Sequence, residues 1–222
     1  MSDLARTATR RAYSSESLGT RVHTALRWRT CPFRDVADVV PRQGAILDAG
    51  CGHGLFSLYL AVQGPERRIT GVDIDDDKLA VARRAATAAG VEDRAAFLRV
   101  TTDWQPDAQW DAIVEVDMLY LLGRARSAGW LRAAAGALSP GGRLVVKELD
   151  VTPAWKARWS RFQEVLATRV MRITEGDDLE LIPRADVIAA MQAAGLEVDS
   201  RPLDRGRLHP HYLVVGTRPR AS

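Results

Sequence analysis

The chain has 222 residues, 46% of them hydrophobic and 27% charged, with a formal net charge of +3. This length suits one domain that buries its own core, and the composition excludes a disordered, collagen-like or repeat protein. No run approaches about 18 uninterrupted apolar residues, so we expect no membrane-spanning helix. The first 11 residues mix Asp3 with three arginines and precede no apolar stretch. They do not resemble a secretory signal, and we expect a cytoplasmic protein.

The two cysteines, Cys31 and Cys51, form neither a disulfide framework nor a zinc-ligand spacing. They indicate a reducing compartment and predict no metal site. Acidic and basic residues are intermixed along the chain, with 31 Lys and Arg against 28 Asp and Glu. This charge pattern gives no reason to expect a nucleic-acid partner. The oligomeric state is left open.

Predicted elements alternate along most of the chain. Residues 1–17 are polar and charged, and we expect them to be mobile. Residues 18–40 are predicted to be helical, with a break at Pro32. Short apolar runs then predict strands at residues 45–48, 68–73, 95–100, 111–116, 143–149, 196–201 and 211–217. Helical periodicity predicts helices at residues 55–62, 77–89, 124–138, 153–173 and 184–194.

This alternation predicts an α/β fold with a Rossmann-like, seven-stranded, mostly parallel sheet and helices on both faces. The last two strands have no helix between them, so they are expected to pair as an antiparallel hairpin. A tight turn is expected at residues 139–142, before the fifth strand. We divide the chain into a helical N-terminal cap, residues 1–40, and a main domain, residues 41–222. The main domain contains a helical insertion at residues 151–183.

The strongest functional signal is the segment from Asp48 to Gly54, DAGCGHG, directly after a strand and directly before a helix. Glycines let a ligand approach the backbone closely, and the following helix offers free N–H groups. The second strand ends at Asp73, where nucleotide-binding α/β folds place a carboxylate for ribose hydroxyls. The pattern is G-x-G-x-G, and Leu55 stands where a dinucleotide fingerprint requires glycine. A nicotinamide-dependent oxidoreductase is therefore disfavoured.

The segment Asp48–Gly54 resembles the first motif of class I S-adenosylmethionine-dependent methyltransferases, an acidic residue followed by x-G-x-G-x-G. The resemblance covers roughly residues 40 to 217 in the family's order. It continues through GVDI at residues 71–74, DAIV at 111–114, DMLY at 117–120, LSPGGRL at 138–144 and AGL at 194–196.

The resemblance implies S-adenosylmethionine as methyl donor and S-adenosylhomocysteine as product. Asp48 would orient the loop and the cofactor's amino group, Asp73 would accept the ribose hydroxyls, and Ile74 would cover one adenine face. The adenine amino group falls near Thr101 or Thr102, with Asp103 just beyond. The full set of expected cofactor-binding residues is Asp48, Gly50, Cys51, Gly52, Gly54, Asp73, Ile74, Thr102, Asp103 and Glu115.

The acceptor is expected to be a small molecule methylated at oxygen or nitrogen, for example an anionic or specialised metabolite. The amino-methylating Asn/Asp-Pro-Pro-Tyr/Phe motif is replaced by residues 115–118, EVDM, and Leu121 stands where the family often carries His. Loops at the carboxyl ends of strands supply the candidate catalytic residues Asp117, Tyr120 and His211. Glu148, Asp150 and His209 lie in the same loops. A purely structural role, such as a helix cap, stays open for each of them.

The predicted helix at residues 153–173 carries an apolar stripe, including Trp155 and Trp159, beside an arginine stripe that includes Arg158 and Arg161. Three interpretations stay open: a packed helix with a solvated arginine face, a cationic wall for an anionic acceptor, or docking to a membrane or acidic carrier. Two alternative functions accompany them, a methyltransferase for a lipid or carrier-bound acceptor and a non-catalytic S-adenosylmethionine-binding module. The N-terminal residues Tyr13, His23, Trp28 and Phe33 are further candidates for the pocket wall.

Overall fold

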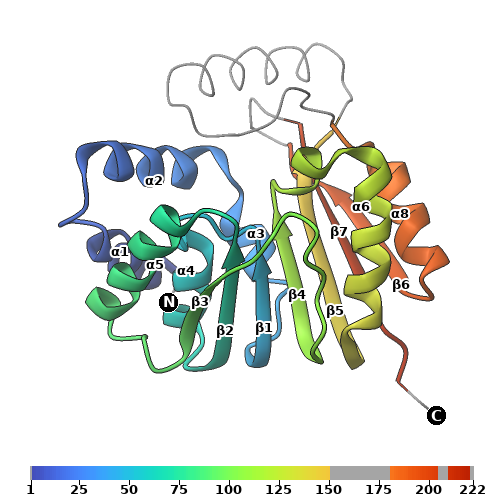
Figure 1. Cartoon of the computed structure of the whole chain (residues 1–222), viewed down its shortest axis with the longest axis horizontal. Coiled ribbons are helices and arrows are strands. Elements are labelled where there is room, and N and C mark those ends of the chain that lie inside the picture. The colour runs from blue at the N-terminus through green and yellow to red at the C-terminus, as the bar shows by residue number, and fades with distance from the viewer. Residues whose placement is uncertain (1, 151–180, 205–209, 221–222) are drawn as a thin grey trace.

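The computed structural model describes residues 2–150, 181–204 and 210–220, in which seven strands form one sheet (Figure 1). The strand order is β3-β2-β1-β4-β5-β7-β6. Strands β1 to β5 pair in parallel, and β7 is antiparallel to both β5 and β6. The predicted Rossmann-like sheet and the antiparallel final pair are confirmed. The strands are β1 (Gln43–Ala49), β2 (Glu66–Asp73), β3 (Ala95–Arg99), β4 (Trp110–Val116), β5 (Leu138–Leu149), β6 (Glu197–Pro202) and β7 (His211–Thr217).

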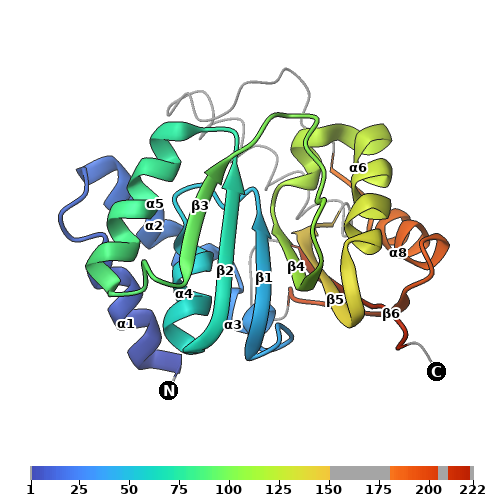
Figure 2. The ribbon, with the colours of Figure 1, turned by 60° about the horizontal axis from the view of Figure 1, so that its bottom comes forward.

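Helices cover both faces of the sheet, as Figures 1 and 2 show from two directions. Alternating side chains of each strand point to opposite faces, so β1 sends Ile46 into one core and Leu47 into the other. The first core packs against the N-terminal helices, α4 and α5, and the second against α6 and α8. The described helices are α1 (Ser2–Ala12), α2 (Leu18–Thr30), α3 (Phe33–Ala37), α4 (Leu55–Gln63), α5 (Asp76–Ala89), α6 (Leu119–Gly136) and α8 (Arg184–Ala193).

The N-terminal segment differs from expectation. Residues 1–17 were expected to be mobile, which is wrong for the described part, because Ser2–Ala12 form α1 and pack on α4 and α5. Ala5, Thr9 and Ala12 lie buried on one face of this helix at helical spacing. Tyr13 is 1% exposed, and its hydroxyl donates to the carbonyl of His53 at 2.8 Å. Small residues make this buried face inconspicuous in the sequence.

The predicted break at Pro32 is confirmed, since α2 ends at Thr30 and α3 begins at Phe33. The division into a cap, residues 1–40, and a main domain remains a prediction. The predicted helix at residues 153–173, most of the insertion at 151–183, and His209 lie outside the described residues.

Two boundaries on the second half of the sheet also differ. Helix α6 begins at Leu119, earlier than predicted, and Gly123 interrupts it with φ 71° and ψ 162°. The Ser127 hydroxyl bridges this kink by donating to the carbonyls of Leu119 (3.0 Å) and Gly123 (2.8 Å). The separate turn expected at residues 139–142 is wrong, because β5 already starts at Leu138. A register shift between Trp110 and Ala112 of β4 absorbs the extra residues as a bulge.

Candidate functional site

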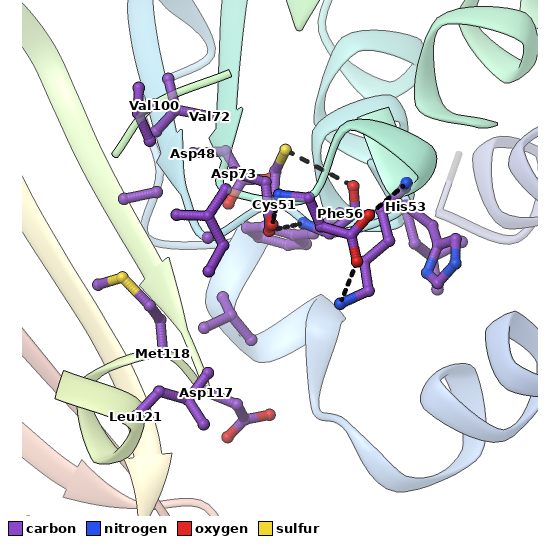
Figure 3. A pocket seen from close by; sticks show the side chains of 18 of the residues that line it. Asp48, Cys51, His53, Phe56, Val72, Asp73, Val100, Asp117, Met118 and Leu121 are labelled. Atoms are coloured by element: carbon purple, nitrogen blue, oxygen red, sulfur yellow. Dashed lines mark hydrogen bonds and ion pairs between the residues drawn. The ribbon is translucent and has the colours of Figure 1, made fainter. Parts of the chain in front are cut away.

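A cavity of about 660 Å³ opens at the carboxyl ends of β1, β2 and β4. The strand order reverses here, because β1 lies between β2 and β4, and open α/β sheets bind ligands at such a point. Helix α2 contributes His23, Thr24 and Arg27 to its wall. Figure 3 shows Asp73 and Cys51 on one side of this space and Met118 and Asp117 on the other.

The glycine loop forms the floor of the cavity. Gly50, Gly52 and Gly54 have φ of 70°, 53° and 73°, in the left-handed region that glycine adopts without strain. A Cβ on Gly50 would lie 2.8 Å from Cγ of Met118, and one on Gly54 would lie 2.7 Å from Cβ of Ala82. A Cβ on Gly52 would meet nothing within 4 Å, and Gly52 lines the cavity. The loop therefore leaves open space over Gly52, as the approach of a ligand to the backbone requires.

Asp73 lies in the wall beside this loop. One carboxylate oxygen, Oδ2, accepts the N–H of Gly52 at 2.7 Å, and Oδ1 accepts the N–H of Asp75 at 3.0 Å. Each carboxylate oxygen can accept a further bond, so Asp73 can still serve a ligand. The next residue, Ile74, also lines the cavity and is 48% exposed, an apolar surface suited to a flat ring.

Asp48 and Cys51 lie deeper. Asp48 is 2% exposed and accepts a hydrogen bond from the Ser57 hydroxyl. Burial raises the pKa of Asp48 to about 7, an effect that the charge of Asp73 reinforces. Burial also raises the pKa of the Cys51 thiol, whose sulfur lies 2.9 Å from where a Cβ on Gly71 would stand. Cys51 is thus a neutral packing residue of the loop.

The other expected cofactor residues divide into two groups. Thr102 lines the cavity together with Thr101 and Trp104, whereas Gly54, Asp103 and Glu115 do not. The Asp103 carboxylate accepts the Thr101 hydroxyl at 2.5 Å. Glu115 is wholly buried, and its carboxylate accepts the N–H groups of Met118 and Leu119 at the start of α6. The structure therefore places Glu115 as a cap of this helix.

Asp117 lies in the wall opposite the loop, in an unusual setting. It has φ 63°, a left-handed conformation that is uncommon for a residue with a side chain. Its carboxylate forms ion pairs with Nζ of the fully buried Lys147 and with Nη1 of Arg27, the latter at 2.7 Å. Burial alone would raise the pKa of Asp117, but Lys147 and Arg27 lower it well below its ordinary value. Asp117 thus stays ionised and paired, which suits it to position other groups and makes it a poor proton acceptor.

The two other catalytic candidates differ in their relation to the cavity. Tyr120 lines the cavity, and its backbone N–H donates to Oε1 of Glu148 at 3.3 Å. His211 is 5% exposed and is absent from the cavity wall. Its Nε2 lies 3.0 Å from the Thr30 carbonyl, so it connects β7 to the end of α2. The structure brings Asp117 and Tyr120 to the cavity wall, and His211 is not part of that wall.

Two buried carboxyl groups lie in the sheet close to Asp117 and Tyr120. Glu115 and Glu148 are both wholly buried at the ends of β4 and β5. Burial and the charge of Glu148 raise the pKa of Glu115 well above its ordinary value. Burial and the charge of Asp117 raise the pKa of Glu148 to about 8. Burial thus favours the protonated form of both groups.

Several wall residues were not predicted from the sequence. They include Arg27, Met118, Trp104 and Trp130. His23 and Phe33, predicted as candidates, do lie in the wall, while Trp28 packs edge-on against Phe33 and Tyr59. Arg27 follows His23 by four residues on α2, so helical spacing was an available signal for it.

Comparison with known proteins agrees with this geometry. Residues 46–142 match the family described as methyltransferase domain. A demethylmenaquinone methyltransferase of Thermus thermophilus is 29% identical over 211 residues, covering 87% of this chain and 90% of the relative. A ubiquinone biosynthesis O-methyltransferase of Aeromonas salmonicida is 31% identical over 156 residues, 69% of this chain and 63% of the relative.

Among solved structures, an O-methyltransferase family protein from Burkholderia thailandensis superimposes with a TM-score of 0.71 at 22% identity. The match covers 90% of this chain and 58% of that protein, so the chain spans less than two thirds of its length. The fold and the glycine-loop cavity define a Rossmann-like α/β protein with a ligand-sized cavity at the reversal of its strand order. Residues 46–142 thus match the methyltransferase-domain family, and the chain as a whole is similar to S-adenosylmethionine-dependent methyltransferases of class I.

Proposed function

We propose that the protein transfers a methyl group from S-adenosylmethionine to an oxygen or nitrogen of a small-molecule acceptor. The observation that carries this proposal is the convergence of Gly50, Gly52 and Asp73 on one open cavity, inside the segment that matches methyltransferase domains. The residues fit the cofactor, because the space over Gly52 is open and Asp73 retains acceptor capacity.

We assign each part of the cofactor to residues of this wall. The glycine loop would take the methionine part, Asp73 the ribose hydroxyls, and Ile74 with Thr102 the adenine. When bound, S-adenosylmethionine supplies an activated methyl group, so correct placement of the acceptor provides much of the rate. The task of this chain's residues is to hold the acceptor in line and to exclude water.

The acceptor is inferred to be a hydroxylated aromatic compound. Aromatic side chains line the cavity from several elements, among them Phe33, Trp104, Tyr120 and Trp130. Such walls favour flat rings. The names of two relatives refer to demethylmenaquinone and to ubiquinone biosynthesis, and one of them is an O-methyltransferase, which favours oxygen as the methylated atom.

Within the site, Tyr120 is proposed to contact the acceptor, because it lines the cavity next to Asp117. Asp117 is proposed as a positioning residue, since its carboxylate is held by Lys147 and Arg27. His211 is proposed to support this arrangement from behind, through its contact with the end of α2.

The test is transfer of label from methyl-tritiated S-adenosylmethionine. The protein is incubated with a panel of catechols, phenols and amines and with a small-molecule extract, and the label in the products is counted. We expect transfer to at least one hydroxylated aromatic compound, and at least about tenfold less transfer by the Asp73→Ala variant when S-adenosylmethionine is kept at a limiting concentration. Cofactor binding without transfer to any compound would contradict the proposal and favour a binding module.

A further inference from the structure

The first turn of α6 is held by two carboxyl groups that come from neighbouring strands. Oε1 of Glu115, near the end of β4, accepts the N–H groups of Met118 and Leu119, the latter at 3.2 Å. Oε1 of Glu148, near the end of β5, accepts the next N–H, that of Tyr120, at 3.3 Å. The residue before the helix, Met118, supplies no side-chain cap of its own. The two glutamates therefore take the place of an N-cap residue for α6.

The second oxygens of the two glutamates are buried beside each other. Strands β4 and β5 pair in parallel with Glu115 opposite Val146, two residues before Glu148, so both glutamates point to the same face of the sheet. Both side chains are 0% exposed. Their Oε2 atoms meet no hydrogen-bond donor in the described part of the chain. Two carboxylates cannot donate to each other, so a proton on one of them is required as the donor.

One proton between the two groups satisfies both of them. The protonated carboxyl donates to Oε2 of the other, and the two side chains are placed to form this hydrogen bond. Loss of this proton would leave two buried negative charges side by side. The charge of Asp117 disfavours a second negative charge, and the charge of Lys147 favours the one that remains. The remaining charge lies at the N-terminus of α6, where the helix dipole stabilises it.

The turn that this pair holds is part of the cavity wall. Met118, Tyr120 and Leu121 line the cavity, and Figure 3 shows Met118 and Leu121 across the space from Asp73. Tyr120 is the residue proposed to contact the acceptor. Methyl transfer depends on in-line placement of the acceptor, so a small displacement of this turn is expected to lower the rate. The two buried carboxyl groups thus control the placement of the wall that faces the glycine loop.

We propose that Glu115 and Glu148 share one proton and, as a hydrogen-bonded pair, act as positioning residues that fix the acceptor wall of the cavity. This inference rests on the proposed function, because it concerns the wall assigned to the acceptor. Neither glutamate lines the cavity, so both act through the backbone of α6.

Glutamine substitutions distinguish a shared proton from two independent helix caps. In Glu115→Gln or Glu148→Gln the amide carbonyl still accepts the backbone N–H, and the NH₂ group donates to the remaining carboxylate as the proton does. The double variant places two NH₂ groups against each other with no acceptor between them. Glu197→Gln, at an exposed glutamate on β6 of the same sheet, is the control.

Three measurements are made on each variant. Infrared difference spectra detect the C=O stretch of a protonated carboxyl, hydrogen exchange reports the amides of residues 118–120, and label transfer is measured to the panel compound that the wild type methylates best. We expect either single variant to remove the whole protonated-carboxyl signal of the pair. Exchange and transfer should stay within about threefold of wild type in each single variant, and both should worsen at least about tenfold in the double variant. Glu197→Gln should behave as wild type in all three.

A double variant whose effects equal the product of the two single effects would overturn the proposal, because the glutamates would then be independent caps. Single variants that each remove only half of the protonated-carboxyl signal would also overturn it. Faster exchange with unchanged transfer would overturn the positioning role. If the double variant does not fold, Glu148→Leu replaces it, and equal transfer by Glu148→Leu and Glu148→Gln would overturn that role.

Failure of the proposed function itself is distinguishable. It appears as a wild-type protein that labels no compound, and the positioning role then falls with it. The infrared and exchange measurements need no acceptor, so they still decide whether the pair shares a proton.

Discussion

Arg27 and Asp117 are 90 residues apart in the sequence, and an ion pair of 2.7 Å joins them in the fold. The pair attaches α2 to the carboxyl end of β4. The same carboxylate also forms an ion pair with Lys147 of β5. One carboxylate thus connects three elements around the cavity. Its ionisation is a structural requirement, since each of its partners is a cation.

Asp117→Asn is expected to destabilise the protein by about 3 kcal/mol or more, because it leaves the buried Lys147 without its anion. The double variant with Lys147→Met should be more stable than Asp117→Asn alone, since it removes the uncompensated charge. Urea unfolding measures both. An unfolding free energy of Asp117→Asn equal to that of wild type would show that the ion pair with Lys147 does not stabilise the fold.

Gly52→Ala separates ligand binding from backbone strain. Gly52 and Gly90 both have positive φ, at 53° and 64°, and an added Cβ meets nothing within 4 Å at either position. Both Ala variants should therefore lose about 1 kcal/mol of unfolding free energy. Gly52→Ala alone should weaken S-adenosylhomocysteine at least about tenfold, because its Cβ enters the cavity. Equal affinities in the two variants would remove Gly52 from the cofactor site.

Asp73→Ala is expected to weaken S-adenosylhomocysteine roughly 10- to 100-fold, the loss of charge-assisted hydrogen bonds to the ribose. The matched control is Asp76→Ala, three residues on, whose exposed carboxylate pairs with Arg99 at 3.5 Å. Calorimetric titration measures both variants. An unchanged affinity in Asp73→Ala would remove the ribose assignment.

The carboxyl pair beneath the site predicts a pH dependence of stability. The pKa of Glu148 is raised from 4.5 to about 8, so the folded state binds a proton that the unfolded state releases above its ordinary pKa. The stabilisation that comes from protonated Glu148 is fully present below pH 4.5 and is lost as the pH rises through about 8.

Glu148→Gln stays neutral at every pH, so its unfolding free energy should fall less than that of wild type between pH 6 and pH 9. The difference should be roughly 1–3 kcal/mol, at 1.36 kcal/mol per pKa unit. Glu92→Gln, an exposed position, is the control. If the unfolding free energies of Glu148→Gln and wild type change equally with pH, Glu148 does not take up this proton.

Local patterns predicted the sheet and the position of the glycine loop well. The G-x-G-x-G segment directly follows β1 and Asp73 ends β2, and parallel strands bring their carboxyl ends together. The three alternate glycines of this segment do adopt positive φ, a conformation that glycine reaches without help from distant residues. The position of the cavity could therefore be predicted from the order of the strands.

The roles of charged side chains could not be predicted in the same way. Glu115 lies near the end of β4 and Asp117 follows it directly. Asp117 pairs with cations, whereas Glu115 is buried and accepts backbone N–H groups at the start of α6. These outcomes depend on Lys147 and Arg27, which come from distant parts of the chain. Helix α1 was missed because its buried face consists of small residues, without a conspicuous apolar stripe.

The helices in the described part of the chain include none with the length and apolar character of a membrane-spanning segment.

The cavity is proposed to bind S-adenosylmethionine, and calorimetric titration of the wild-type chain is the direct test. S-adenosylhomocysteine is the ligand, and NAD is the parallel control. We predict binding of S-adenosylhomocysteine in the micromolar range or tighter and no binding of NAD. Binding of NAD alone would contradict the assignment of the cavity to S-adenosylmethionine.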